Sequence, residues 1–176
     1  MVDEDRNRHG RWRRGVGSQA VGDAPGWLAG AAGVPSTIED VLGLRAEAKG
    51  AFDLLWDGLY DPARLDPRLT ELCRLRVAQL VQADAELARR EPAATTAGLT
   101  DDDVAALSSW PSSQRFGPAE RAALAYAELF VMDPSSVTDE MAADVLEHLG
   151  APGAAALSIA LSTFDARART CVALGL

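Results

Sequence analysis

The sequence predicts an all-α fold. Hydrophobic residues make up 48% of the 176 residues, aromatic residues make up only 6%, and alanine is abundant. This composition suits closely packed helices, because alanine favours the helix and lets helix axes approach each other. Apolar residues recur at helical spacing in several segments, whereas no segment has the alternation of a strand or the turn signal of a hairpin. The length is sufficient for one domain with a substantial core.

Capping signals place three helices in the first half of the expected domain. Ser36 and Glu39 form a capping-box pattern, which predicts a short helix. A second helix is predicted over residues 44–60, where apolar residues recur on one face. Asp66 and Pro67 then open a long third helix, since Asp is a favoured cap and Pro suits the first turn.

Cap residues also place the helices of the second half. Thr100, with three Asp residues after it, starts a helix, and residues 110–117 form a loop. The remaining predicted helices are one over 118–132, one capped by Thr138 and closed by Gly150, and an alanine-rich one from Pro152 to near the C-terminus.

Residues 1–33 are expected to form a disordered arm ahead of a single domain at 34–176. Glycine and arginine dominate the arm, which suits either a solvated tail or contact with an anionic partner, and we expect the tail. No apolar segment follows the arginines, which argues against a secretory signal, and no run approaches the length of a membrane span. We therefore expect a cytoplasmic protein that does not contact membranes.

Charge and residue counts exclude several function classes. The formal net charge of −9 argues against binding to nucleic acid, which requires a basic surface. His9 and His148 are too few for a multi-histidine metal site. Cys73 and Cys171 are too far apart in the sequence for a zinc knuckle or a redox pair. We expect no metal site and no other cofactor.

Three segments carry a resemblance to a known family through their order and spacing: residues 65–80, residues 98–107 followed by 116–128, and residues 156–175. Together they resemble the alkylhydroperoxidase D-like and carboxymuconolactone decarboxylase superfamily. The resemblance covers roughly residues 34–176 and implies an alkylhydroperoxidase D-like helical bundle. It also implies a homo-oligomer, a trimer or a multiple of a trimer, with sites near subunit contacts.

The chain departs from the redox members of this superfamily at the position of their chemistry. Their Cys-x-x-Cys pair corresponds to Ala83 and Glu86, and the His of their proton relay corresponds to Arg90. Glu71 matches the relay glutamate, and Arg169 is what remains of an Asn-x-x-Asn-Arg motif in the last helix. Thiolate attack on a peroxide cannot run at a position without sulfur.

Two glutamates are the candidate catalytic residues. If the third helix continues to residue 86, Glu71 and Glu86 share one face, and two close carboxylates push each other's pKa values apart. Glu71 is then either a buried general acid or base with a raised pKa, or the structural partner of a nearby arginine. Glu86 is alternatively a solvent-facing glutamate that pairs with Arg89 or Arg90.

Arg90 and Arg169 are the candidate anchors for the carboxylate of a small acid, because the guanidinium fork matches a carboxylate. The alternative for both is ion pairing at the surface or between subunits. We interpret Cys73 and Cys171 as core residues, with a reactive Cys171 as the alternative.

These residues lead to three hypotheses about function. The first is a lyase- or isomerase-type enzyme that performs cofactor-free proton transfer, decarboxylation or rearrangement on a small organic acid or metabolite. The second is an antioxidant peroxidase that uses Cys73 or Cys171. The third is a catalytically inactive binding or assembly protein. An open polar site around Glu71 favours chemistry, whereas a filled site favours a structural role.

Overall fold

The computed structural model describes residues 35–176, and within this range the regular structure is entirely helical, which confirms the all-α prediction. The arm expected over residues 1–33 lies outside the described residues. The elements are α1 (Ile38–Gly43), α2 (Ala46–Leu59), α3 (Pro67–Val81), α4 (Asp84–Ala88), α5 (Pro92–Thr96), α6 (Asp101–Ala106), η1 (Leu107–Ser109), α7 (Pro118–Met132), η2 (Pro134–Ser136) and α8 (Asp139–Leu174).

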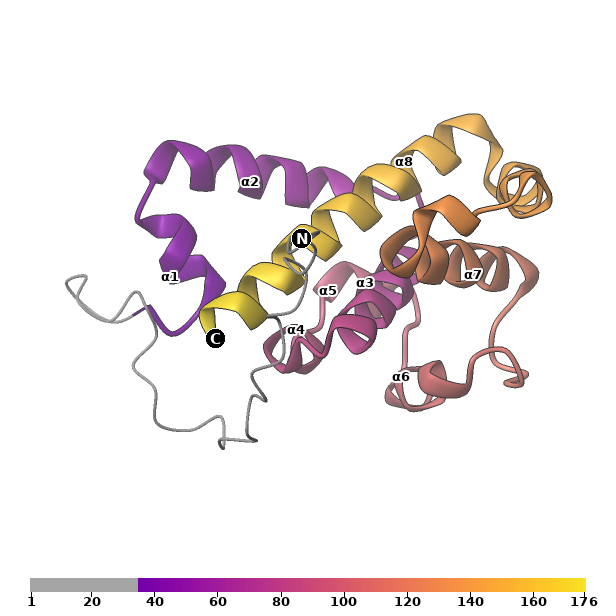
Figure 1. Cartoon of the computed structure of the whole chain (residues 1–176), viewed down its shortest axis with the longest axis horizontal. Helices are drawn as coiled ribbons and strands as arrows, with labels where there is room; N and C mark the ends of the chain where they lie inside the picture. The colour runs from indigo at the N-terminus through magenta and orange to yellow at the C-terminus, as the bar shows by residue number, and fades with distance from the viewer. Residues whose placement is uncertain (1–34) are drawn as a thin grey trace, which may run out of the picture.

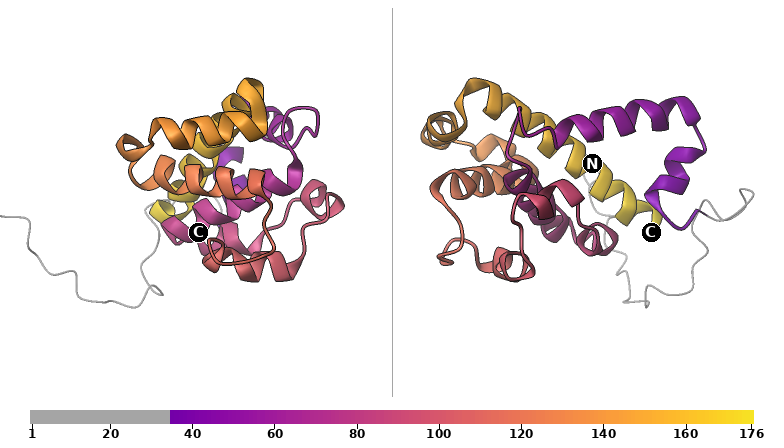
Figure 2. Two further views of the ribbon diagram at one scale, coloured as in Figure 1. Left: turned by 90° about the vertical axis from the view of Figure 1, so that its right-hand side faces the viewer. Right: turned by 180° about the vertical axis from the view of Figure 1, so that it is seen from behind.

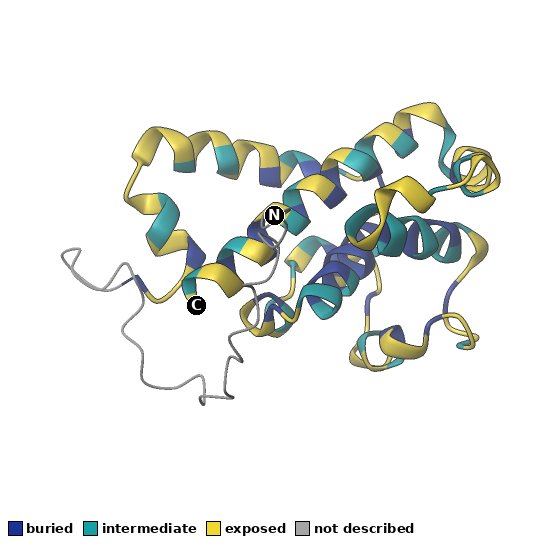
Figure 3. Ribbon diagram, viewed as in Figure 1, coloured by how far each residue is buried: buried dark blue, intermediate teal, exposed yellow. Residues whose placement is uncertain are grey.

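Three long helices form the core of the domain. Helices α3, α7 and α8 pack against one another, and the buried face of α3 lies between the other two (Figure 1; Figure 2). Leucine and alanine side chains fill this contact, as the alanine-rich composition predicts. Its fully buried members include Leu72, Leu75, Val77, Ala123, Leu124, Leu157 and Leu161. Figure 3 shows the same core by burial, because α3 is mostly buried whereas α2, outside the three-helix contact, is mostly exposed.

Helix α3 begins as predicted but is shorter than a continuous helix to residue 86. The Asp66 carboxylate accepts hydrogen bonds from the backbone N–H groups of Arg68 and Leu69, and Pro67 occupies the first turn. Gln82 then adopts a left-handed backbone conformation with φ 59°, which ends the helix. The short helix α4 follows, so Glu71 and Glu86 lie on separate helices.

Helices α1 and α2 extend from this core. Helix α2 projects beside α8, and α1 turns back toward the C-terminal end of α8 (Figure 1). The capping box of α1 is formed by Thr37 and Asp40, one residue later than the predicted pair Ser36 and Glu39. Asp40 accepts hydrogen bonds from the N–H groups of Ser36 and Thr37, which leaves the Glu39 side chain available for other partners.

Helix α8 joins the last two predicted helices through a kink. Gly150 has φ 66° and ψ 171°, a conformation open to glycine, and Pro152 follows it. By length and composition α8 is apolar enough to cross a membrane, a test that core helices of soluble proteins also pass. The contacts of α8 with α3 and α7 assign it to the core of the domain.

Candidate functional site

Arg74 of α3 is at the centre of a group of buried charges. Its Nε and Nη2 atoms donate to the two carboxylate oxygens of Glu71 at 2.8 and 2.6 Å. Its Nη1 atom donates to Oε2 and to the main-chain carbonyl of Glu86 at 3.1 and 2.8 Å. Nη2 also donates to the carbonyl of Arg89 at 2.9 Å. The planar guanidinium therefore ties α3 to α4 and to the segment after α4.

Glu71 is held as a charged acceptor. Besides Arg74, it accepts hydrogen bonds from the Tyr60 hydroxyl at 2.5 Å and from the backbone N–H of Glu91 at 3.2 Å. Burial by itself raises the pKa of Glu71. The hydrogen bonds and positive charge of Arg74, together with the hydrogen bond from Tyr60, have a larger opposite effect and hold the pKa below its usual value. This direction is opposite to that required of a buried general acid.

The Tyr60 hydroxyl is a dependable donor to this carboxylate. Burial, together with the negative charge of Glu71, raises the pKa of Tyr60 above its usual value. The phenol therefore keeps its proton, and that proton is directed at Glu71 Oε2. Tyr60 follows the last turn of α2, so this contact also fixes α2 to α3.

Glu86 lies at the start of α4 with its side chain turned inward. It is 2% exposed, so the solvent-facing alternative with Arg89 or Arg90 as side-chain partner is wrong. Its carboxylate is instead shared between Arg74 and Arg167 of α8, whose Nε donates to Oε1 at 2.8 Å. The Cys171 thiol lies 3.7 Å from the same oxygen. Glu86 thus joins the end of the long α8 to α3 and α4.

The group of charges reaches the surface through Glu39 of α1. Arg167 Nη2 and Arg89 Nη1 both donate to Glu39 Oε1, at 2.7 and 2.9 Å. Arg89 also pairs with Glu91, which accepts a further hydrogen bond from Trp56 Nε1 at 3.1 Å. A continuous path of ion pairs therefore runs from the interior to an exposed helix.

We call these seven ionic side chains the charge network: Glu39, Glu71, Glu86, Glu91, Arg74, Arg89 and Arg167. Its four carboxylates outnumber its three guanidinium groups by one. Within residues 35–176 no buried side-chain nitrogen or oxygen lacks a hydrogen-bond partner. Burial of so many charges is tolerated only because each is paired.

The chemical groups of the charge network are carboxylates and guanidinium ions. They suit proton transfer and the binding of anions. The thiols suit nucleophilic attack less, because burial raises the pKa of Cys73 to about 12, and burial together with the charge of Glu86 raises that of Cys171 to about 11. No cluster of three potential metal ligands is present among the described residues.

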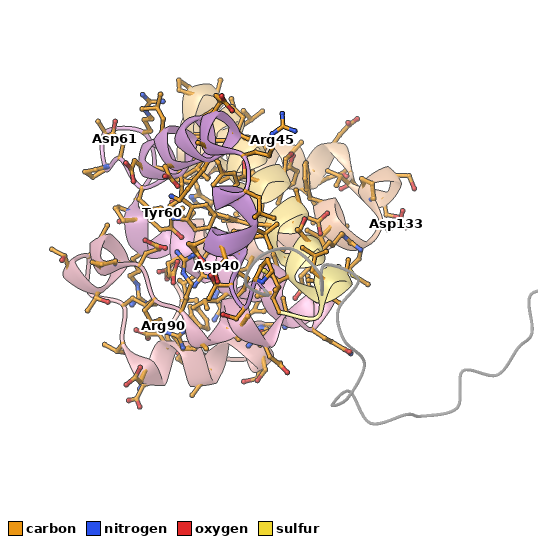
Figure 4. The ribbon with its side chains drawn as sticks, turned by 90° about the vertical axis from the view of Figure 1, so that its left-hand side faces the viewer. Asp40, Arg45, Tyr60, Asp61, Arg90 and Asp133 are labelled. Carbon is orange, nitrogen blue, oxygen red and sulfur yellow. The ribbon has the colours of Figure 1, made fainter. Side chains whose placement is uncertain are left out.

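The structure brings Glu71 and Glu86 together and leaves Arg90 and Arg169 outside. Arg90 is exposed, and its guanidinium donates to the carbonyls of Leu87 and Arg89 (Figure 4). Arg169 pairs with Asp165 on the outer side of α8, at 2.7 Å. Both arginines therefore lie at the surface, which was the alternative interpretation, and neither lies beside Glu71 and Glu86 as an anchor for a substrate carboxylate.

Arg74, Arg167 and Glu39 are members of the site that the sequence patterns did not identify. Arg74 carried a local signal, since it follows Glu71 at the i,i+3 spacing of a helical ion pair. Arg167 lies between the apolar residues Phe164 and Ala168, where a charge needs a buried partner. Its partner Glu86 is 81 positions away and Glu39 is 128 positions away, so no local pattern identifies either one.

Two surface hollows lie apart from these carboxylates. A groove of about 990 Å³ between α2 and α8 is lined mainly by apolar side chains, among them Leu54, Leu55, Pro152, Ala155, Ala156 and Ile159. A smaller hollow of about 220 Å³ lies beside Arg90 and Thr100. Neither includes Glu71 or Glu86, so we locate the candidate site by its chemistry, at the charge network.

Comparison with known proteins agrees with the predicted resemblance. Residues 46–129 match the model of the Carboxymuconolactone decarboxylase family. The crystal structure of a protein of unknown function from Agrobacterium tumefaciens, provisionally assigned as an antioxidant defence protein AhpD, has the same fold. Its TM-score is 0.64 at 17% sequence identity, over 77% of this chain and 92% of that chain. Comparison with curated proteins gave no match.

Proposed function

We propose that this chain, of which residues 46–129 match the model of the Carboxymuconolactone decarboxylase family, performs cofactor-free acid/base chemistry on a small organic acid. The reaction class is proton transfer, decarboxylation or a related rearrangement. The observation that carries the proposal is the pair of carboxylates, Glu71 and Glu86, held on one buried guanidinium, Arg74. We also infer that the protein acts in the cytoplasm as a homo-oligomer, a trimer or a multiple of a trimer.

Within this proposal Glu86 is the proton-transfer group. It is the carboxylate that Arg167 links to the exposed Glu39. Arg74 and Arg167 on either side of Glu86 supply positive charge where negative charge develops on a substrate. Glu71 is a positioning residue, since its ionised carboxylate fixes Arg74, which in turn fixes Glu86.

The test is proton exchange and decarboxylation with a panel of small mono- and dicarboxylic acids in D2O, followed by NMR. We expect turnover by the native chain and a loss of roughly 10²–10⁴-fold in Glu86→Gln, the usual contribution of a general base. Glu147→Gln, an exposed glutamate outside the charge network, is the matched control. Full activity of either Glu86→Gln or Glu71→Gln on an identified substrate would refute the proposal.

A second candidate function is a catalytically inactive binding or assembly protein. It is favoured by the criterion stated for Glu71, because the site is filled rather than open: Glu71 has 0% exposure and lines neither surface hollow. Every buried polar side-chain nitrogen and oxygen among the described residues is also partnered. A native chain that is folded and inactive on the whole panel would support this candidate.

Peroxidase chemistry through Cys73 or Cys171 is disfavoured by the raised pKa values of both thiols. A comparison of peroxide consumption with a dithiol reductant separates this possibility from the other two. Turnover is expected only in the double variant Ala83→Cys/Glu86→Cys, in which a redox pair is restored. Turnover by the native chain would assign the activity to one of its own cysteines.

A further inference from the structure

We infer that Arg89 and Arg167 form a carboxylate-binding clamp, and that Glu39 of α1 occupies this clamp in place of a small carboxylate ligand. The inference deepens the proposed function and rests on it, because it identifies the anchor for an organic acid. Its consequence is that α1 covers the route to Glu86 until a ligand carboxylate replaces that of Glu39.

The clamp is defined by two guanidinium groups that meet on one oxygen. Arg167 Nη2 lies 2.7 Å and Arg89 Nη1 lies 2.9 Å from Glu39 Oε1. The two arginines come from the C-terminal part of α8 and from the segment after α4. A carboxylate is the chemical group that the clamp already holds, through one charge-assisted hydrogen bond from each guanidinium group.

An aromatic platform holds both arginines in place. The guanidinium carbon of Arg167 lies 4.7 Å from the ring centroid of Trp56 and 5.7 Å from that of Phe52. The guanidinium carbon of Arg89 lies 5.3 Å from the same Trp56 ring. Cation–π contacts of this kind orient a guanidinium without occupying its outer edge.

The arginines remain anchored without Glu39. Arg167 keeps its hydrogen bond to Glu86, and Arg89 keeps its ion pair with Glu91. Glu39 itself is the accessible member, since its side chain is 49% exposed whereas that of Arg167 is 3% exposed. Exchange of one carboxylate for another therefore preserves the charge balance and leaves no buried guanidinium unpaired.

The position of α1 is consistent with displacement. It is a single six-residue helix at the end of the α2 projection, and Ile38 is its buried side chain (Figure 1). The view of Figure 4, from the end of the molecule that carries α1, shows this helix with Asp40 in front of the body. The Glu39 carboxylate contacts Arg167, and Arg167 in turn contacts Glu86. A ligand carboxylate in the clamp would therefore contact Arg167, and only the Arg167 side chain would separate it from Glu86, the proposed proton-transfer group.

The test measures ligand binding without any turnover. Benzoate is titrated calorimetrically into the native chain and into Glu39→Ala, with benzamide as the uncharged probe. We expect Glu39→Ala to bind benzoate at least about tenfold more tightly than the native chain, because the intramolecular competitor is removed. Benzamide is expected not to bind, and the control Glu47→Ala on α2 is expected to match the native chain.

A second variant links the effect to the clamp. In Glu39→Ala/Arg89→Gln the gain in benzoate affinity should be lost, and thermal melts of all variants establish that they are folded. Equal benzoate affinity in the native chain and Glu39→Ala, or no binding by either, would overturn the inference. Binding without turnover would refute the proposed chemistry alone, whereas turnover without binding at the clamp would refute the clamp alone.

Discussion

Replacement of Arg74 by methionine tests whether the charge network stabilises the fold. Arg74 contacts two carboxylates and two main-chain carbonyls, and it lies with Glu71 and Glu86 almost completely out of solvent. Methionine fills much of the same volume, so the cost comes mainly from two buried carboxylates that lose their shared partner. Removal of one member of a buried ion pair costs about 3–5 kcal/mol. This is a large part of the total stability of about 5–15 kcal/mol typical of a domain.

Urea unfolding followed by circular dichroism at pH 7 measures this difference in the free energy of unfolding. The matched control is Arg169→Met, which removes a surface ion pair on α8 and should change the free energy of unfolding by no more than about 1 kcal/mol. Addition of Glu71→Leu to Arg74→Met should recover part of the loss, because the unpaired charge disappears. A loss below about 1 kcal/mol in Arg74→Met would refute the argument that Arg74 compensates the two buried carboxylates.

Two further predictions concern pH and the backbone. Because the native pKa of Glu71 is held below its usual value, its contribution to stability is present above the unfolded pKa of about 4.3 and is lost as pH falls below it. Glu71→Gln should therefore show a smaller loss of unfolding free energy between pH 5 and pH 3 than the native chain, and equal losses would contradict this cause. Gly150→Ala should destabilise the domain by about 1–3 kcal/mol, because its φ of 66° and ψ of 171° suit glycine almost alone. The control Gly50→Ala, inside α2 with no neighbour within 4 Å of the added carbon, should instead stabilise by about 0.5–1 kcal/mol, and thermal melts that rank the two alike would refute the argument.

Local residue chemistry was sufficient to predict most helix boundaries. Asp66 and Pro67 predicted the start of α3, and Thr138 predicted the cap of α8, because caps depend on side chains only a few positions from the backbone groups that they bind. The same local reasoning placed the α1 cap one residue too early, since Ser36-Glu39 and Thr37-Asp40 compete for the same role. It also missed the end of α3, where Gln82 takes a left-handed conformation that glycine or asparagine adopts more often.

The residues of the candidate site likewise fall into two groups, those that the sequence indicates and those that only the tertiary structure reveals. The sequence by itself determined the helical fold class, the family resemblance, the absence of a Cys-x-x-Cys pair and the choice of Glu71 and Glu86 as candidate residues. Only the tertiary structure decided that Arg74 and Arg167 share Glu86, that Glu39 reaches Arg167, and that Arg90 and Arg169 lie outside. The physical reason is that a cap or an amphipathic face is set by neighbours three or four positions away. The partner of a buried charge, in contrast, is whatever group chain packing brings within hydrogen-bond distance.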